Sequence, residues 1–491
     1  MKIFISYPPL RDIKGTPLLG QNRQYQVFHN PTFIYPLVPA SAATLLKTKG
    51  YQVLWNDCIA QRWDYQRFLQ FIKQEKPDLI AIETKTPVVK QHWQIINQLK
   101  NASTINYKLS TVLMGDHVSA LPEESMQNSA VDFVLTGGDY DFSLLSIAEH
   151  LDRDRPLAAG IYYRDNGLIK NSGNFQLNPD LDQLPFIDRD LTKWRLYGEK
   201  LYKRTPFAYT MAGRDCPWAR CTFCSWTTLY PYFRVRSPEN LLGEIGLLLK
   251  KYKVREIFDD TGTFPSGGWL DRFCRGMIAR GFNKKLLFSC NFRFDYLNKE
   301  RLKLMKQAGF RLFKLGLESA NQGTLDRLNK NVRVEQFEQG CRMAKQAGLE
   351  VHLTIMLGYP WETRADALNT VNMAMNLMKR GLADMLQATV VVPYPGTPLY
   401  QESLKNNWFR FAHTQYQRYD MQEPVLESAD IAPQEVMALT DKVYSSFLQP
   451  LFMARYLKKI RSFSDIKYIL RGLKALAGHR LDFKRGLNEK R

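Results

Sequence analysis

The sequence predicts an α/β protein with two successive parallel-sheet units and a helical, basic region at the C-terminus. Two observations support this prediction. Short apolar runs of β type alternate with amphipathic helical stretches, which is the pattern of repeated β-α units. Positive charge gathers at the end of the chain, where twelve Lys or Arg and three acidic residues lie between Leu451 and Arg491. At 491 residues, the chain is long enough for about three domains.

The first unit, residues 1–150, contains five predicted strands with helical stretches between them. These strands are Lys2–Tyr7, Tyr51–Asn56, Leu79–Glu83, Ser110–Met114 and Asp132–Thr136. Their order predicts a doubly wound, Rossmann-like sheet, and such sheets bind ligands outside the carboxyl ends of their strands. No Gly-x-Gly-x-x-Gly follows the first strand, which argues against a dinucleotide. Residues 151–205 are polar and punctuated by proline, so we expect a linker that crosses the surface.

Residues 206–400 repeat the β-α unit six times, which predicts a partial (β/α)6 TIM barrel. The predicted strands are Phe207–Met211, Glu256–Asp259, Leu286–Cys290, Arg311–Leu317, Glu350–Leu357 and Met385–Val392. The helices between them are Pro238–Tyr252, Trp269–Arg280, Lys299–Ala308, Val334–Ala347 and Ala365–Arg380. Parallel barrels place their chemistry at the C-terminal ends of the strands. Polar and Gly-rich segments follow several of these strands, and residues 401–491 form the helical basic region.

Three cysteines within nine residues, Cys216, Cys221 and Cys224, form the most informative motif. Three thiolates leave the fourth position of a metal site open, whereas structural zinc takes four protein ligands. The other four cysteines are scattered singly, and no second Cys-x-x-Cys is present. A cubane iron–sulfur cluster with one open iron is therefore the favoured interpretation. A zinc clip or three ordinary buried cysteines are the alternatives.

The flanks of the motif, Gly213-Arg214-Asp215-Cys216-Pro217-Trp218 and Cys221-Thr222-Phe223-Cys224, resemble the cluster loop of radical S-adenosylmethionine (SAM) enzymes. In that family, the open iron chelates the amino and carboxylate groups of SAM and delivers one electron that cleaves it. The family's usual spacing is Cys-x3-Cys-x2-Cys, whereas four residues separate Cys216 from Cys221. We expect the loop to accommodate the extra residue as a bulge.

This resemblance implies a SAM site at the ends of the barrel strands. The segment after the second strand would face the methionyl amine, the segment after the fourth strand would lie near the ribose and carboxylate, and the ends of the fifth and sixth strands would surround the adenine. The implied residues are Asp259, Asp260, Thr261, Glu318, Ser319, Gly358, Glu362 and Pro393. Each alone is more often a turn or a solvated residue. Their order after the cysteines supports the assignment.

Residues 1–150 resemble the cobalamin-binding domain that precedes the barrel in class B radical SAM proteins. The matching segments are Val38–Leu46, His117–Glu124 and the glycine pair after the fifth strand. The implied cobalamin-site residues are Pro8, Gly115, His117, Gly137 and Gly138. The loop after the first strand has no histidine, so we expect base-off cobalamin with no histidine on cobalt. A Rossmann-like module that binds another ligand, or none, is the alternative.

The resemblance implies an enzyme with a [4Fe–4S] cluster, SAM and cobalamin, and it favours a C-methyltransferase acting on an unactivated carbon of a lipid-like or secondary-metabolite substrate. The alternatives are a non-methylating cobalamin-dependent radical SAM cyclase or oxidative enzyme, and a non-catalytic corrinoid or iron–sulfur binding protein. A tRNA methylthiotransferase should carry a second three-cysteine set and an RNA module, and the sequence shows neither. We assign no catalytic acid or base beyond the cluster. An external electron donor such as flavodoxin or ferredoxin is implied.

The cysteines are too few and too irregular for a secreted disulfide framework, and the N-terminus does not resemble a signal peptide. No apolar run approaches the about 18 residues that span a bilayer, so we expect a cytoplasmic protein. Apolar residues recur at helical spacing between Leu457 and Leu476. Residues 451–491 are therefore predicted to contact an anionic membrane peripherally, or to pack on the barrel with a solvated basic face. Nucleic acid is the weaker candidate partner, because no RNA-binding module is visible.

Overall fold

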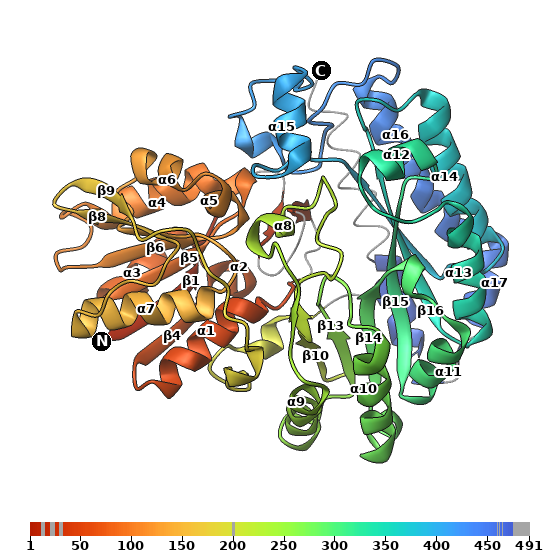
Figure 1. Ribbon diagram of the computed structural model, residues 1–491, viewed down its shortest axis with the longest axis horizontal. Helices are drawn as coiled ribbons and strands as arrows, with labels where there is room; N and C mark the ends of the chain where they lie inside the picture. The colour runs from red at the N-terminus through yellow and green to blue at the C-terminus, as the bar shows by residue number, and fades with distance from the viewer. Residues whose placement is uncertain are drawn as a thin grey trace.

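The computed structural model describes residues 1–10, 15–19, 25–28, 33–198, 202–458, 460, 462–463 and 465–474. Two sheets from successive parts of the chain stand side by side (Figure 1). The N-terminal sheet is drawn in red and orange, and the partial barrel runs from green to blue. Helix α8 (Trp226–Leu229) lies between them, and helix α15 (Pro398–Lys405) lies above the gap. The predicted α/β fold class is confirmed.

The N-terminal sheet has seven strands in the order β4-β1-β5-β6-β7-β8-β9. Five of them match the sequence prediction: β1 (Lys2–Tyr7), β4 (Gln52–Asp57), β5 (Leu79–Glu83), β6 (Ser110–Met114) and β7 (Phe133–Leu135). These five are parallel. Most of their side chains are buried, which explains why they appear in the sequence as nearly continuous apolar runs. The chain reverses its winding direction between β1 and β5, so this is the point where a ligand crevice is expected.

Helices cover both faces of this sheet. They are α1 (Leu37–Thr48), α2 (Cys58–Gln61), α3 (Tyr65–Glu75), α4 (Val89–Lys100), α5 (Asp116–Ala120), α6 (Pro122–Asn128) and α7 (Tyr140–Arg153). Helices α1 and α7 pack against each other. The short strands β2 (Thr16–Leu18) and β3 (Gln26–Phe28) form a separate antiparallel pair.

The sheet continues beyond residue 150, into the segment predicted as a linker. Strands β8 (Ile161–Asp165) and β9 (Leu168–Asn171) form an antiparallel hairpin on its edge. The side chains of β9 are exposed, Leu168 by 66%, so this strand has no buried apolar face that a pattern search would detect. The turn between the strands is Asn166-Gly167, and both residues have positive φ. An Asn-Gly pair is a strong hairpin signal that our sequence analysis did not use.

The second sheet is the predicted six-stranded partial barrel, in the order β10-β13-β14-β15-β16-β17. Its strands are β10 (Phe207–Thr210), β13 (Glu256–Asp259), β14 (Leu287–Phe292), β15 (Phe310–Glu318), β16 (Glu350–Leu357) and β17 (Met385–Val390). All neighbouring pairs are parallel. The intervening helices include α9 (Pro238–Lys250), α10 (Gly267–Ala279), α11 (Lys299–Gln307), α12 (Gln322–Arg327), α13 (Glu335–Gln346) and α14 (Arg364–Lys379).

Capping residues set where these helices begin. Ser237 accepts a hydrogen bond from the backbone N–H of Asn240, and proline occupies the first position of α9. Thr363 and Asp366 form a reciprocal capping box at the start of α14. These caps fix the direction in which each helix leaves the strand ends.

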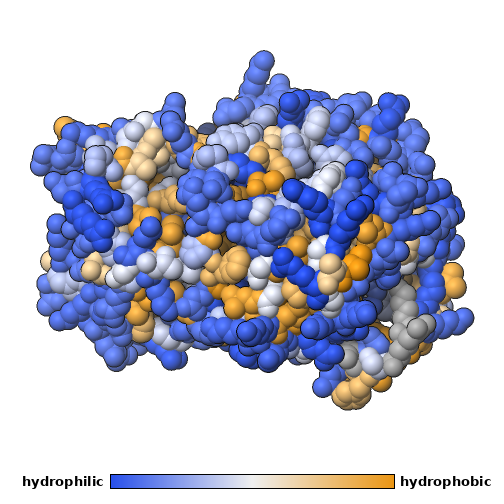
Figure 2. Space-filling view, turned by 60° about the horizontal axis from the view of Figure 1, so that its bottom comes forward, coloured by the Kyte–Doolittle hydropathy of each residue, from blue (hydrophilic) through white to orange (hydrophobic). Residues whose placement is uncertain are grey.

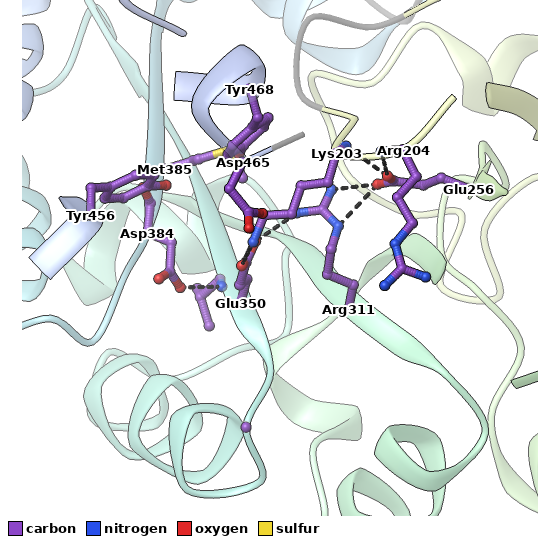
Figure 3. Close-up of polar contacts among 12 residues, drawn as sticks. Lys203, Arg204, Glu256, Arg311, Glu350, Asp384, Met385, Tyr456, Asp465 and Tyr468 are labelled. Atoms are coloured by element: carbon purple, nitrogen blue, oxygen red, sulfur yellow. Dashed lines mark hydrogen bonds and ion pairs between the residues drawn. The ribbon is translucent and has the colours of Figure 1, made fainter. Parts of the chain in front are cut away.

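A buried ion network closes the amino-terminal end of the barrel (Figure 3). Arg311 on β15 donates to Glu256 at 3.0 Å and to Glu350 at 2.6 Å. Lys203 also pairs with Glu350, and Glu256 accepts from the backbone N–H groups of Lys203 and Arg204. Charged groups at this end of a parallel barrel stabilise the fold, because the chemistry occurs at the opposite end.

The C-terminal region packs partly on the barrel. It contains α16 (Pro433–Tyr444), α17 (Pro450–Leu457) and helical residues 465–474. The hydroxyl of Tyr468 contacts the sulfur of Met385 on β17, and Arg471 donates to the carbonyl of Tyr202 at 2.7 Å, before β10. Residues 465–474 therefore bridge the unpaired first and last strands of the barrel.

The same region leaves large apolar side chains exposed. They are Leu448, Leu451, Met453, Leu457, Phe463, Ile466, Leu470 and Leu473. Figure 2 shows the lower face of the molecule, which is mostly hydrophilic with apolar side chains gathered near its middle. Within the described ranges, no helix has the length and hydropathy that a bilayer crossing requires. The predicted basic tail beyond residue 474 lies outside the described residues.

Candidate active site

The cysteine motif lies in a loop at the carboxyl end of the barrel strands. Strand β11 (Gly213–Arg214) pairs with β12 (Arg234–Val235), and the two enclose the loop. Cys216, Cys221 and Cys224 are partly buried, and none of the seven cysteines, all of which are described, forms a disulfide. Ala219 has φ of 44°, a left-handed conformation that bends the segment between the first two cysteines. The four-residue spacing is thus accommodated by a local bend.

The segment after β13 holds this loop in place. The Sγ atom of Cys216 lies 3.2 Å from Oγ1 of Thr263, and Asp215 accepts from the backbone N–H of Gly262 at 2.7 Å. A Cβ on Gly262 would lie 2.1 Å from the Asp215 carboxylate, so only glycine allows this approach. The start of the cysteine motif is therefore tied directly to the second strand end.

Three predicted SAM residues belong to this same support. Asp259 accepts from the hydroxyl of Thr210 at 2.8 Å and from the backbone N–H groups of Ala212 and Thr261. Thr261 accepts from the N–H of Gly213 at 3.0 Å, and Asp260 is buried with its N–H bonded to the carbonyl of Thr210. Among the described residues, these hydrogen bonds of Asp259 and Thr261 hold the cysteine loop. That Asp259, Asp260 and Thr261 face SAM stays a prediction, and the side chains of Asp259 and Thr261 also support the loop.

Positive side chains surround the second cysteine. Burial raises the pKa of the Cys221 thiol, whereas Lys330 and Arg293 act in the opposite direction. Lys330 forms a buried ion pair with Glu318 at 2.8 Å. Burial lowers the pKa of Lys330, but Glu318 and Cys221 outweigh it, and the pKa ends above its ordinary value. These cations offset the negative charge that thiolates bring.

Glu318 adopts φ of 62° at a register shift between β15 and β16, a conformation that is strained for a residue with a side chain. A Cβ on Gly316 would lie 2.1 Å from the Oε1 atom of Glu318. The carboxylate therefore passes directly over the backbone of its own strand to reach Lys330. The predicted site residue Glu318 is thus next to the cysteine loop.

The donor set fits an iron–sulfur cluster. Across the described ranges, no three His, Cys, Asp or Glu side chains converge as they would around one metal ion. A cubane bonds each thiolate to a different iron, so its three protein ligands stand apart. Three thiolates with no fourth protein ligand, beside two cations, match such a cluster with one open iron.

A second group of predicted residues meets around Glu362, after β16. Its Oε1 atom accepts from Ser319 at 2.7 Å, Thr324 at 2.8 Å and Asn321 at 3.3 Å. Its Oε2 atom is buried and has no hydrogen-bond partner among the described residues. Burial raises the pKa of Glu362, and the donors to Oε1 only partly oppose this effect. The unused oxygen fits a ligand that brings hydrogen-bond donors, as the amine and ribose of SAM do.

Two other predicted residues shape the strand ends. Gly358 has φ of 88°, where the chain turns after β16, and Pro393 is buried just beyond β17. The neighbouring Tyr394 hydroxyl accepts from the N–H of Tyr25 at 3.3 Å, which ties the N-terminal segment to this end of the barrel.

At the carboxyl edge of the first sheet, a buried lysine that our sequence analysis did not assign marks the expected crevice. The Nζ atom of Lys85 lies 3.9 Å from both Glu83 and Asp116 and has no hydrogen-bond partner among the described residues. Tyr7 at the end of β1 donates to Glu83 at the end of β5, across the point where the winding reverses. A buried ammonium without hydrogen bonds fits a ligand with acceptor oxygens, and the amide and phosphate groups of cobalamin supply them.

The predicted cobalamin residues differ in what they contact. Pro8 follows Tyr7 at the same edge and is buried. Gly115 has φ of 140°, and a Cβ there would lie 2.1 Å from the carbonyl oxygen of Thr84. Gly137 packs against the side chain of Phe175, and Gly138 packs against the side chain of Tyr230. Close packing accounts for this glycine pair without a ligand.

His117 is fully buried, and both ring nitrogens have protein partners. Nδ1 lies 3.2 Å from Thr86, and Nε2 lies 3.2 Å from Glu124. Tyr416, from the C-terminal region, packs edge-on against the ring with centroids 4.7 Å apart and donates to Glu124. This geometry leaves neither nitrogen of His117 available to a metal.

Residues 212–374 match the model of the radical SAM superfamily. These residues form a radical SAM domain. The match begins just before Cys216 and ends in α14, so it contains the cysteine loop, the Glu318–Lys330 pair and Glu362. Proteins of this family use SAM and a [4Fe–4S] cluster.

Curated relatives resemble this chain, two of them over most of its length and a third over about half. It is 26% identical over 444 residues to an uncharacterized methyltransferase of Pyrococcus horikoshii, covering 89% of this chain and 93% of the relative. It is 24% identical over 444 residues to the anaerobic magnesium-protoporphyrin IX monomethyl ester cyclase of Cereibacter sphaeroides, covering 88% and 69%. It is 26% identical over 244 residues to the hopanoid C-3 methylase of Methylococcus capsulatus, covering 48% and 44%. These relatives support the prediction that the chain is an enzyme.

Solved structures share the fold of nearly the whole chain. The radical SAM methyltransferase TsrM from Kitasatospora setae, solved with cobalamin and a [4Fe–4S] cluster, gives a TM-score of 0.70 at 15% identity over 98% of this chain and 99% of that one. The cobalamin-dependent radical enzyme OxsB, solved with aqua-cobalamin and SAM, gives 0.64 at 15% identity over 95% and 71%. The chain therefore has the fold of these cobalamin-dependent radical SAM enzymes.

Proposed function

We propose that this protein is a cobalamin-dependent radical SAM methyltransferase that modifies an unactivated carbon. The observation that supports this most directly is the contact between the two candidate cofactor edges. Helix α8 begins two residues after Cys224 and packs on α5 of the first sheet. The Nζ atom of Lys85 lies 5.7 Å from the centre of the Trp226 ring. Groups bound at the two edges would therefore be neighbours.

The protein's own residues hold and separate these groups. When bound, the cluster, SAM and cobalamin supply one-electron cleavage of SAM and methyl transfer, while the protein orients them and excludes side reactions. Cys216, Cys221 and Cys224 would hold the cluster. Glu362 would accept hydrogen bonds from SAM, and Lys85 would donate to acceptor oxygens of cobalamin. The electron would come from an external donor such as flavodoxin or ferredoxin.

The substrate class is the finer part of this proposal. We propose a lipid-like or secondary-metabolite substrate, reached with peripheral contact between residues 451–491 and an anionic membrane. The exposed apolar side chains between Leu448 and Leu473, interspersed with Arg455 and Lys467, support this surface role. Cosedimentation with vesicles of anionic lipid, compared with neutral lipid, tests it. Equal recovery from both vesicle types would remove the electrostatic argument.

A non-methylating cyclase is the second candidate, because the cyclase of Cereibacter sphaeroides matches 88% of the chain. Product mass separates the two functions, since methylation adds one methylene and ring closure removes hydrogen.

The test of the proposed chemistry is anaerobic. The protein is reconstituted with iron, sulfide and cobalamin, then given SAM and dithionite, and 5′-deoxyadenosine is quantified. We expect the product from wild type, none from Cys221→Ala, and near wild-type amounts from Cys341→Ala, a buried cysteine on α13 far along the chain from the loop. A cluster-loaded wild type that releases no 5′-deoxyadenosine would refute the enzymatic proposal.

A further inference from the structure

A buried network of two arginines and two aspartates joins the first sheet to the cysteine loop. Asp139 and Asp141 come from the segment after β7, where α7 begins. Arg214, two residues before the first cysteine, bonds to Asp139 at 2.8 Å and to Asp141 at 3.0 and 2.5 Å. Arg234 on β12 bonds to both oxygens of Asp139, at 2.6 and 2.8 Å. All four side chains are at most 5% exposed.

The same segment of the first unit also contacts the chain after the last cysteine. The Tyr230 hydroxyl donates to the carbonyl of Gly138 at 2.8 Å, and the N–H of Gly138 donates to the carbonyl of Leu229 at 3.1 Å. Residues 137–141 thus hold the cysteine loop on both sides, at Arg214 before it and at Leu229, Tyr230 and Arg234 after it.

The cysteine loop needs this external support because the strand pair from which it extends is short. Strands β11 and β12 are two residues long, and their register joins Gly213 to Val235 and Arg214 to Arg234. An isolated two-stranded pair is marginally stable even when it is longer. The network adds bidentate, charge-assisted hydrogen bonds at this base, which fix direction as well as distance. Its two positive and two negative charges balance, so every buried charge has a partner.

We propose that Asp139 and Asp141 are positioning residues for the cysteine loop: the N-terminal unit sets the geometry in which Cys216, Cys221 and Cys224 meet their ligand. This inference rests on the proposed function only in taking that ligand to be an iron–sulfur cluster. The two aspartates act through Arg214 and Arg234, and they need not touch the cluster.

Asp141→Asn tests the proposal, with Glu350→Gln as its matched control. Both substitutions remove one charge from a carboxylate that faces an arginine, but Glu350, which is 14% exposed, lies at the opposite end of the barrel (Figure 3). After anaerobic reconstitution, iron and sulfide per chain, the electron paramagnetic resonance spectrum of the reduced cluster and the melting temperature are measured. We expect Asp141→Asn to bind less than about half as much cluster as wild type and to change the spectrum. We expect Glu350→Gln to keep the wild-type cluster content and spectrum, and the two variants to have similar melting temperatures.

A second readout needs no cluster. Arg220 is exposed within the cysteine loop, so tryptic cleavage there reports how firmly the loop of the cluster-free protein is held. We expect cleavage about fivefold faster in Asp141→Asn than in Glu350→Gln, because local opening becomes easier. Equal cleavage in the two variants, or full cluster content with an unchanged spectrum in Asp141→Asn, would overturn the inference. A wild type that takes up no cluster would refute the proposed function, while cleavage at Arg220 still decides the positioning role.

Discussion

Replacing Glu362 with glutamine tests whether its unpartnered oxygen serves SAM. Three donors, from Ser319, Asn321 and Thr324, converge on Oε1, so the carbonyl oxygen of the new amide will occupy that position. The NH2 group then replaces Oε2 and turns a buried acceptor into a donor. A buried polar group left without its hydrogen-bond partner costs about 1–3 kcal/mol. The dissociation constant of SAM should therefore rise about 5- to 150-fold.

The assay is anaerobic equilibrium binding of SAM to cluster-loaded protein, with melting temperature measured in parallel. Burial raises the pKa of Glu362, which means that the ionised side chain is disfavoured there, so the neutral amide should not lower stability. Glu402→Gln, at a half-exposed carboxylate paired with Arg327, is the control and should bind SAM like wild type. An unchanged dissociation constant for Glu362→Gln, within about twofold, would refute the assignment of Oε2 to SAM.

Three further predictions concern stability. Gly138→Ala places a Cβ 2.2 Å from the Tyr230 ring and should cost about 1–3 kcal/mol in thermal denaturation, whereas Gly268→Ala meets no atom within 4 Å and should not destabilise. Arg311→Met leaves two buried carboxylates without their main partner and should cost about 3–5 kcal/mol; an unchanged melting temperature would contradict this. Burial raises the pKa of Asp57 from 3.8 to about 6. The folded state then binds that proton more tightly than the unfolded state, so stability should fall by about 3 kcal/mol as pH rises from about 4 to 6, and pH-dependent denaturation of Asp57→Asn should lack this component.

The fold could be predicted because the parallel strands of both sheets are mostly buried. Burial on both faces makes each strand an apolar run, and the predicted strands agree with the observed ones to within a few residues. The hairpin of β8 and β9 was not predicted, because its outer strand is solvent-exposed and an exposed strand needs no apolar pattern. Only the Asn166-Gly167 turn carried a local signal.

The site was predictable in its position and less so in its contacts. The cysteine spacing and the order of the strand ends locate the loop, since carboxyl ends of parallel strands share one edge. Which side chain faces a ligand depends on tertiary hydrogen bonds. Asp259 and Thr261 form theirs with the cysteine loop, whereas one carboxylate oxygen of Glu362 has no hydrogen-bond partner among the described residues. Lys85 lies in a segment at a strand end where a ligand is expected, but it could not be singled out, because a lysine becomes informative only when burial removes its water.

The hydrogen bond from Arg471 to Tyr202 joins residues 269 positions apart. During synthesis, the strand that follows Tyr202 and every other strand of the barrel leave the ribosome before the helical residues 465–474 that bridge its first and last strands. The barrel can therefore begin to fold, but its seam stays open until the last part of the described chain emerges. Loss of residues 465–474 should slow folding of the barrel and increase aggregation through its open seam. These residues lie far from the cysteine loop in sequence and at the opposite end of the strands.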